Sequence, residues 1–270
     1  MIPAAFEYER AESVEHAIEL LGRDVDAKLL AGGHSLIPLL RLRSYVRPSL
    51  LVDIGRLDEL RFVREEGDRI AIGALTRHAQ LVADPLLVRE CALVAEGAAL
   101  VGDPQVRHRG TIGGSIAHGD PASDLATIAL TLDAELVAVG PDGERTIPAG
   151  EFFTGPFSTA LGARDVLTEI RVPKAERGVY LKHQRRAADW ATVAVAAASV
   201  DGDVHVGLAS MGATPLRARA VEQALADGAS PAEAAEHAAE GAEPPSDVSG
   251  SSDYRAHLAR VLARRALEQL

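Results

Sequence analysis

The sequence predicts a mixed fold of helices and strands in two domains, and three observations carry this prediction. Apolar residues make up 47% of the 270 residues and charged residues 25%, which is the usual composition of a globular protein. In the first part of the chain, segments with helical spacing of apolar residues alternate with short strand-like segments. A polar segment at 174–178 then precedes a hairpin pattern and an alanine-rich tail, which indicates that a second domain begins there.

The N-terminal part is expected to contain a helix followed by strands and glycine turns. The first helix is indicated by Ser13, which can cap it, and by Gly22, which follows its last apolar residue. The elements expected in this part are a helix at 13–21, a short strand before a turn at Gly32 and Gly33, a helix that Ser35 can cap, strands at 49–55 and 68–76, and a helical segment at 85–101.

The remaining elements complete the first domain and build the second. Asp201 and Gly202 form the expected tight turn of a hairpin, because Asp-Gly adopts the positive φ angles that two-residue hairpin loops need. The elements expected here are a buried helix at 125–133, strands at 134–140 and 165–173, the hairpin at 192–212, a helix with a capping box at 230–241, and a helix at 253–270 with Leu258, Val261, Leu262 and Leu267 on one face.

Composition excludes several classes of protein. A formal net charge of −11 argues against a nucleic-acid partner, because binding phosphate backbones needs a concentrated positive surface. The longest near-continuous apolar run, at 190–200, is too short to span a membrane, and the N-terminus lacks a signal-peptide pattern. A single cysteine, Cys91, permits no internal disulfide and no cysteine-ligated cluster. A cytoplasmic protein is therefore expected.

Two segments share a pair of glycines followed by a serine, and they are the candidate binding elements. They read AGGHS at 31–35 and TIGGS at 111–115. Glycine lets successive backbone N–H groups point into one concavity and lets an anion approach the main chain. Two such turns, each placed where a strand ends and a helix begins, could hold a pyrophosphate from both sides without a lysine.

Other interpretations of the same residues stay open at this point. Glycine pairs often mark only tight turns, and Asp124 can either cap or charge the first turn of the following helix or accept a hydrogen bond from a ligand. His34 and His118 are interpreted as loop residues, since neither has a second ligand at metal-binding spacing. The basic segment that holds Lys182, Arg185 and Arg186 is typical of surface ion pairs.

The familiar nucleotide and hydrolase motifs are missing. The sequence contains no G-x-x-x-x-G-K-[ST], no G-x-G-x-x-G after the first strand and no G-x-S-x-G. A P-loop, a Rossmann dinucleotide fold and a serine nucleophile are therefore not predicted, and no catalytic residue is assigned.

Several long segments together resemble the FAD-binding (medium) subunit of molybdenum hydroxylases. The likeness is closest to the carbon monoxide dehydrogenase medium subunit and more distant to the flavin domain of xanthine dehydrogenase, and it runs in order from about residue 5 to the C-terminus. The segments that carry it are KLLAGGHSLIPLLRLR at 28–43, GDPQVRHRGTIGGSIAHGDPASDL at 102–125, EFFTGPFSTAL at 151–161, VLTEIRVP at 166–173 and YLKHQRRAADWATVAVA at 180–196.

The resemblance implies an α+β FAD-binding fold of the type found in vanillyl-alcohol oxidase and MurB, followed by a smaller α+β domain. The implied FAD-binding domain covers 1–175, with subdomains of about 1–55 and 56–175, and the C-terminal domain covers 176–270. In that family the FAD pyrophosphate is held by the two glycine turns, an aspartate contacts the cofactor, and two further positions lie near the isoalloxazine ring. The matching residues are Ala31, Gly32, Gly33, His34 and Ser35, then Thr111, Ile112, Gly113, Gly114 and Ser115, then Asp124, and near the ring Leu167 and Lys182.

The implied activity is electron transfer. Substrate is oxidised at a molybdenum cofactor on a large partner subunit, electrons pass through [2Fe–2S] clusters on a small subunit, and FAD in this chain hands them to an external acceptor. The implied assembly is a dimer of such heterotrimers. Two alternatives remain: a free-standing FAD-dependent oxidase or reductase, and a non-catalytic module whose glycine turns bind another phosphate ligand.

Overall fold

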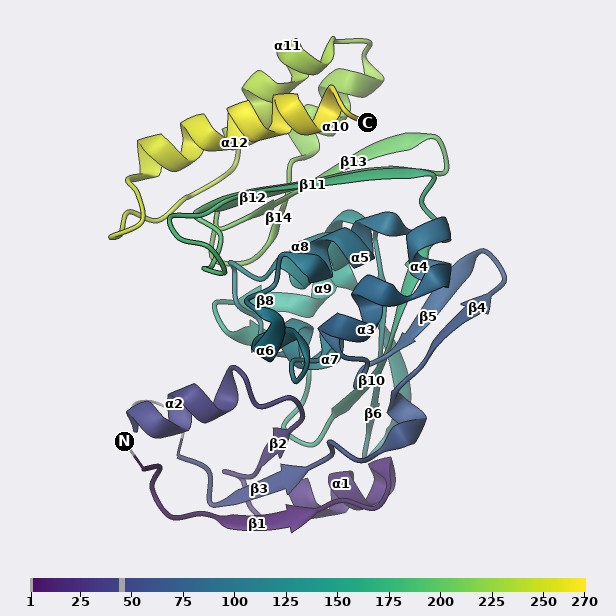
Figure 1. Cartoon of the computed structure of the whole chain (residues 1–270), viewed down its shortest axis with the longest axis vertical. Helices are drawn as coiled ribbons and strands as arrows, with labels where there is room; N and C mark the ends of the chain where they lie inside the picture. Colours follow the sequence, from purple (N-terminus) through teal and green to yellow (C-terminus); the bar gives the residue numbers. More distant parts are fainter. Residues whose placement is uncertain (1, 44–46) are drawn as a thin grey trace.

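The computed structural model describes residues 2–43 and 47–270, in which three larger sheets are stacked along the long axis of the molecule (Figure 1). The N-terminal sheet lies at one end, the central sheet and its helices in the middle, and the C-terminal sheet with its covering helices at the other end. The mixed helix-and-sheet class that the sequence predicts is confirmed. Over the described ranges, no helix is long and apolar enough to cross a membrane.

The N-terminal sheet is small and parallel. Its order is β1-β3-β2, so the two connections between strands must cross over, and each contains a helix. Ser13 caps the first of these helices by accepting a hydrogen bond from the N–H of His16, as the sequence predicts. The elements are β1 (Glu7–Arg10), α1 (Val14–Leu21), β2 (Lys28–Leu30), α2 (Leu36–Leu42) and β3 (Leu50–Asp53).

The central sheet is antiparallel with the order β4-β5-β10-β6-β7, and helices cover one of its faces (Figure 1). Its strands are β4 (Val63–Glu66), β5 (Arg69–Gly73), β6 (Glu135–Gly140), β7 (Gly143–Pro148) and β10 (Val166–Pro173). The accompanying helices are η1 (Asp58–Leu60), α3 (His78–Ala83), α4 (Pro85–Glu90), α5 (Ala92–Ala99), α6 (Pro104–Arg107), α7 (Ile112–Ala117), α8 (Asp124–Thr131) and α9 (Ala149–Phe152), and a short pair, β8 (Phe153–Gly155) and β9 (Ser158–Thr159), follows.

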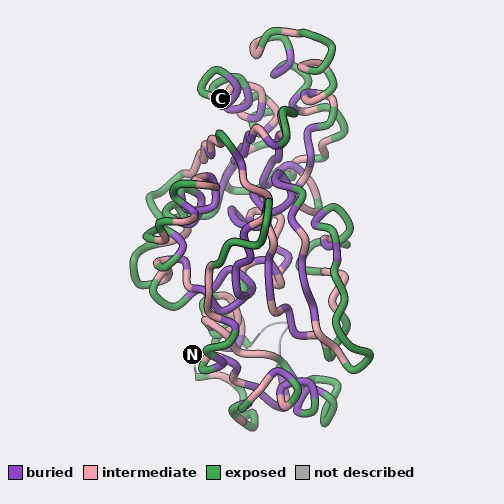
Figure 2. The backbone as a smooth tube through the Cα atoms, turned by 90° about the vertical axis from the view of Figure 1, so that its right-hand side faces the viewer, coloured by how far each residue is buried: buried purple, intermediate pink, exposed green. Residues whose placement is uncertain are grey.

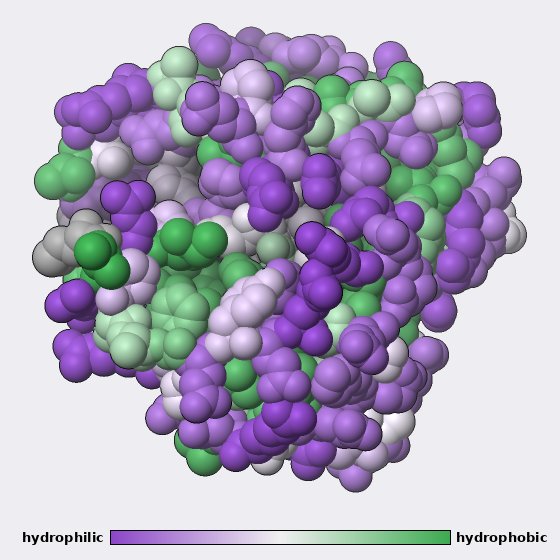
Figure 3. Space-filling view, turned by 60° about the horizontal axis from the view of Figure 1, so that its bottom comes forward, coloured by the Kyte–Doolittle hydropathy of each residue, from purple (hydrophilic) through white to green (hydrophobic). Residues whose placement is uncertain are grey.

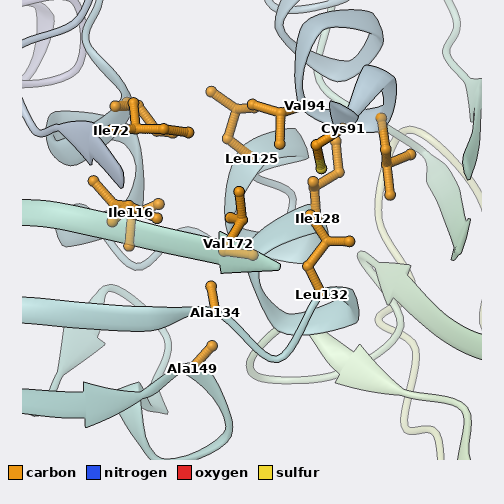
Figure 4. Close-up of a cluster of buried hydrophobic side chains, with 14 of the residues drawn as sticks. Ile72, Cys91, Val94, Ile116, Leu125, Ile128, Leu132, Ala134, Ala149 and Val172 are labelled. Atoms are coloured by element: carbon orange, nitrogen blue, oxygen red, sulfur yellow. The ribbon is translucent and has the colours of Figure 1, made fainter. Parts of the chain in front are cut away.

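The largest apolar core lies between this sheet and its helices. Figure 4 shows Ile72 and Val172 from the sheet facing Ile116, Leu125 and Ile128 from the helices. Every residue of α8 is buried, because this helix is covered by α5 on one side and by the C-terminal sheet on another. The buried part of the chain accordingly runs through the middle of the molecule (Figure 2).

The C-terminal sheet is antiparallel with the order β11-β12-β13-β14 and separates two apolar cores. In β12 the even-numbered residues from Ala194 to Val200 belong to the central core, whereas Val193, Val195 and Ala197 belong to a second core under α10, α11 and α12. The elements are β11 (Arg177–His183), β12 (Val193–Val200), β13 (Asp203–Ala209), β14 (Leu216–Arg217), α10 (Arg219–Ala226), α11 (Pro231–Ala235), η2 (Glu236–Ala239) and α12 (Ser252–Leu267).

Most of the expected elements are present, including the hairpin turn at Asp201 and Gly202 and the capping box that begins α11. Two expectations need correction. The helical segment at 85–101 is two helices, because the backbone of Cys91 leaves the helical region and the chain turns there. Ser35 precedes α2 but its side chain makes no capping hydrogen bond.

Candidate functional site

The first glycine segment forms a tight turn after β2. Gly33 has a φ of +76°, a conformation that favours glycine, and the chain then enters α2. The backbone N–H groups of the four residues from Gly32 to Ser35 donate to no acceptor among the described residues. This turn therefore presents a row of free main-chain donors, which is the arrangement that holds an anion.

The second glycine segment is built differently from what the sequence predicts. No strand ends before it; Thr111 makes only an isolated bridge to Arg77 and then caps α7 by accepting from the N–H of Gly114 at 3.2 Å. The two preceding N–H groups are engaged as well: that of Ile112 donates to the carbonyl of Thr76 at 3.0 Å, and that of Gly113 to the carbonyl of Ala74 at 2.9 Å.

Because these donors are engaged, the expectation that both segments offer free backbone N–H groups is wrong for the second segment. The chain at the second segment and just before it packs against the first segment. A methyl group added to Gly32 would lie 2.3 Å from the carbonyl oxygen of Arg109, and one added to Gly114 would lie 3.9 Å from the Cβ atom of Ala31. Gly32 therefore packs against the backbone of Arg109 and Gly110, which directly precede the second segment, and Ala31 lies close to Gly114 within that segment.

A cavity of about 290 Å³ opens beside the first glycine turn. Its walls are Ala31 and Gly32, the carboxyl ends of β2 and β3, and three arginines. A smaller hollow of about 40 Å³ adjoins it and reaches Thr111 of the second segment. The arginines are Arg56, Arg77 and Arg109. No local pattern in the sequence marks these three residues, since only their common position in the fold brings them together.

Asp124 and Lys182 come together in a second, buried cluster. The Nζ atom of Lys182 donates to Oδ2 of Asp124 at 3.0 Å, and the two side chains are 3% and 4% exposed. The hydroxyl of Tyr180 donates to Oδ1 of Asp124 at 2.6 Å, and Lys182 donates in addition to the carbonyl of Leu100 at 3.1 Å. The interpretation of Lys182 as part of a surface ion pair is therefore wrong, and Asp124 is not the helix cap, a role that Ser123 fills.

Burial sets the electrostatics of this cluster. It raises the pKa of the Asp124 carboxyl above its usual range, and the Lys182 ammonium and the two hydrogen bonds oppose that shift. Burial also raises the pKa of Tyr180 well above its usual value, and the neighbouring carboxylate adds to the effect. Tyr180 was not predicted from the sequence, although the period of two in β11 places it on the same face as Lys182.

The cluster is linked to the second glycine segment through a pair of serines. The hydroxyl oxygens of Ser115 and Ser123 lie 3.0 Å apart, and Ser123 caps the helix that begins at Asp124. Leu167 is buried in β10 at a bulge and lines neither of the two cavities. His34 and His118 lie near the glycine segments, and the described part of the chain contains no group of three or more histidine, cysteine or acidic residues that could hold a metal.

Comparison with protein families decides the assignment. The FAD binding domain in molybdopterin dehydrogenase matches residues 4–175, and the CO dehydrogenase flavoprotein C-terminal domain matches residues 178–270. The chain belongs to this family of FAD-binding subunits. The resemblance found in the sequence is thereby confirmed.

Individual relatives match this chain over nearly its whole length and theirs. The carbon monoxide dehydrogenase medium chain of Hydrogenophaga pseudoflava is 41% identical over 280 residues, which cover 99% of this chain and 97% of the relative. The glyceraldehyde dehydrogenase medium chain of Sulfolobus acidocaldarius is 35% identical, with full coverage of both chains. Among solved structures, carbon monoxide dehydrogenase from Hydrogenophaga pseudoflava lacking the Mo-pyranopterin moiety superposes with a TM-score of 0.95 at 42% identity, covering 100% of this chain and 98% of that one. Quinoline 2-oxidoreductase from Pseudomonas putida 86 superposes with a TM-score of 0.93 at 32% identity, covering 99% and 97%.

The residues present fit the cofactor of this family. The first glycine turn offers free N–H donors to a diphosphate and lies beside a cavity that Ala31 and Gly32 help to line. The face that carries the N-terminal sheet is mostly hydrophilic, with hydrophobic side chains gathered in separate patches (Figure 3).

Proposed function

We propose that this chain is the FAD-containing electron-transfer subunit of a molybdenum hydroxylase complex. The observation that carries the proposal is the row of free N–H groups from Gly32 to Ser35, in a chain that matches the family over residues 4–175 and 178–270. FAD, when bound, supplies the redox chemistry, accepting electrons from iron–sulfur clusters and releasing them to an external acceptor.

The chain's own residues bind and position the cofactor. The turn from Ala31 to Ser35 donates to the diphosphate, and the chain from Arg109 to Gly114 packs against that turn. The buried pair of Asp124 and Lys182, with Leu167, borders the flavin ring in this proposal. Because the ammonium group is positive, it favours extra negative charge on a nearby ring.

The names of its relatives support a proposal for the partners of this chain. Two of them are named as the medium chain of a dehydrogenase, so partners of other sizes are implied: a large molybdenum subunit and a small [2Fe–2S] subunit. We propose that these assemble as a dimer of heterotrimers in the cytoplasm. Within this chain, 1–175 form the FAD-binding domain, with subdomains of about 1–55 and 56–175, and 176–270 form the C-terminal domain.

The substrate of the complex is a property of the large subunit. Relatives are named for carbon monoxide, glyceraldehyde, nicotine and caffeine, although their FAD-binding chains are all similar to this one. Similar FAD-binding chains thus occur in enzymes with different substrates. This agrees with a role in electron transfer, in which the FAD-binding chain need not contact the molecule being oxidised.

The proposal is tested by titrating FAD into the purified, flavin-free chain and following the quenching of flavin fluorescence. We expect saturable binding of one equivalent and no substrate turnover without the partners. Gly32→Ala should abolish or strongly weaken binding, whereas Gly150→Ala, which meets no atom within 4 Å, is the matched control. A wild-type chain that binds no FAD, either alone or in its native complex, would contradict the proposal.

A further inference from the structure

His78 is a buried histidine at the start of α3, and it is 3% exposed. Its ring lies against Gly110, the residue just before the second glycine segment. A methyl group added to Gly110 would lie 2.7 Å from the Cδ2 atom of His78 and 2.8 Å from its Nε2 atom. The main-chain N–H of His78 also donates to the carbonyl of Gly110 at 3.0 Å. The ring and the backbone of His78 thus both hold Gly110 in place.

Gly110 in turn lies against the first glycine turn. A methyl group added to Gly32 would lie 2.8 Å from the Cα atom of Gly110. Gly32 begins the row of free N–H groups on which the proposed function rests. A continuous line of contacts therefore runs from His78 through Gly110 to Gly32. Because neither glycine has a Cβ atom and buried groups are close-packed, a change in the size of the ring must move the backbone above it.

Hydrogen bonds fix one side of this line of contacts but not the other. Main-chain hydrogen bonds of 2.9 to 3.0 Å join the chain at 110–113 to the chain at 74–78. By contrast, the N–H groups from Gly32 to Ser35 donate to no acceptor in the part of the chain that the structure describes. Packing on Gly110 therefore helps to set where the first turn lies.

The ring of His78 is not held there by a hydrogen bond within the described ranges. Its Nδ1 atom is buried and has no partner among those residues. Burial lowers the pKa of His78 to about 4, and the charges that His34 and Arg107 can carry add to the shift. The ring is therefore neutral at pH 7. What it supplies at this position is its shape, a flat group that fits against a residue without a side chain.

We propose that His78 is a positioning residue for cofactor binding, an inference that rests on the proposed function. Its ring sets the position of Gly110 and, through Gly110, the position of the first glycine turn. The effect concerns the diphosphate end of FAD, because the buried pair of Asp124 and Lys182, proposed to border the flavin ring, is held by other contacts.

A size swap between the two contacting residues tests the inference. Gly110→Ala places a methyl group against the ring, and His78→Ala leaves a gap beside Gly110, so each should displace the first turn. In His78→Ala/Gly110→Ala the methyl group takes part of the space that the ring leaves, and the nearest remaining atom is the carbonyl oxygen of Val106 at 3.2 Å. Val94→Ala, a truncation of a buried residue of α5 in the central core, is the control for a general loss of stability.

FAD is titrated into the flavin-free full-length chain, and each dissociation constant is corrected for the folded fraction measured by circular dichroism. We expect each single variant to weaken FAD binding at least about fivefold, and the double variant to bind FAD more tightly than either of them. Val94→Ala should bind as wild type does. The midpoint potential of the bound flavin should be equal in all of these proteins, because the contacts around the ring are unchanged.

The results that would overturn the inference are separate from those that bear on the proposed function. Wild-type affinity in either single variant, or a double variant that binds no more tightly than the weaker single variant, would overturn the role of His78 and leave the proposed function intact. Equal weakening by Val94→Ala, or a shifted midpoint potential in the His78 variant, would also overturn it. A wild type that binds no FAD, alone or in its native complex, would instead count against the proposed function.

Discussion

Removing the ammonium group of Lys182 should destabilise the protein strongly. In Lys182→Met a carboxylate that is only 4% exposed loses its charged partner and keeps one hydrogen bond, from Tyr180. Breaking a buried ion pair by removing one partner costs about 3–5 kcal/mol, because the remaining charge is left uncompensated. Neutralising that charge should restore much of the loss, so Lys182→Met/Asp124→Asn should be more stable than Lys182→Met.

Urea unfolding at pH 7, followed by circular dichroism, gives the free energies of unfolding of wild type, Lys182→Met and the double variant.

The pH dependence of these free energies is a second test. Without the ammonium group the folded-state pKa of Asp124 rises further above its unfolded value, so the folded state binds the proton more tightly. The stability of Lys182→Met should therefore fall, relative to wild type, as the pH rises above about 4. A loss below about 1 kcal/mol for Lys182→Met, or a double variant less stable than it, would refute the reasoning.

Three further predictions concern other parts of the chain, and a fourth returns to Lys182. Burial lowers the pKa of His78 to about 4, so stability should be complete above pH 6.5 and decrease by up to about 3 kcal/mol as the pH falls to 4. In His78→Gln, urea unfolding should show a smaller fall in stability between pH 6.5 and pH 4 than in wild type. An equal fall would mean that another group causes the pH dependence. Gly32→Ala should lower stability by about 1–3 kcal/mol by forcing a methyl group against the Arg109 backbone, and Gly150→Ala, compared by thermal melting, should not. Lys182→Met should lower the flavin midpoint potential, measured by spectroelectrochemistry, because a positive charge near the reduced ring is lost; an equal potential would remove Lys182 from that role. Burial raises the pKa of the Cys91 thiol to about 12, so native protein should resist iodoacetamide until denaturant is added, and rapid labelling of the native chain would contradict this.

Local chemistry made much of the secondary structure predictable. Ser13 caps α1, and Asp201 with Gly202 turns the hairpin, because each of these signals acts within a few residues. The break between two helices at Cys91 could not be predicted, because the helical spacing of leucine, valine and alanine continues across this residue. Only tertiary packing separates α4 from α5.

The candidate site was only partly predictable for the same reason. The glycine pairs were visible in the sequence, but it does not show whether their N–H groups are free. In the second segment the N–H groups of Ile112 and Gly113 donate to the carbonyls of Thr76 and Ala74, which follow β5. Arg56 and Arg77 come from different loops and meet only because the N-terminal and central sheets pack together. Tyr180, two residues before Lys182 in a strand, could have been found from alternation alone.

The central claim is that this chain carries FAD within a molybdenum hydroxylase. Affinity purification of the tagged chain from its native host, with flavin and metal analysis and identification of the co-purifying chains, tests it most directly. We predict FAD equimolar with the chain, together with molybdenum and iron on two further subunits. Recovery of the chain without molybdenum, iron or partner chains would contradict the account.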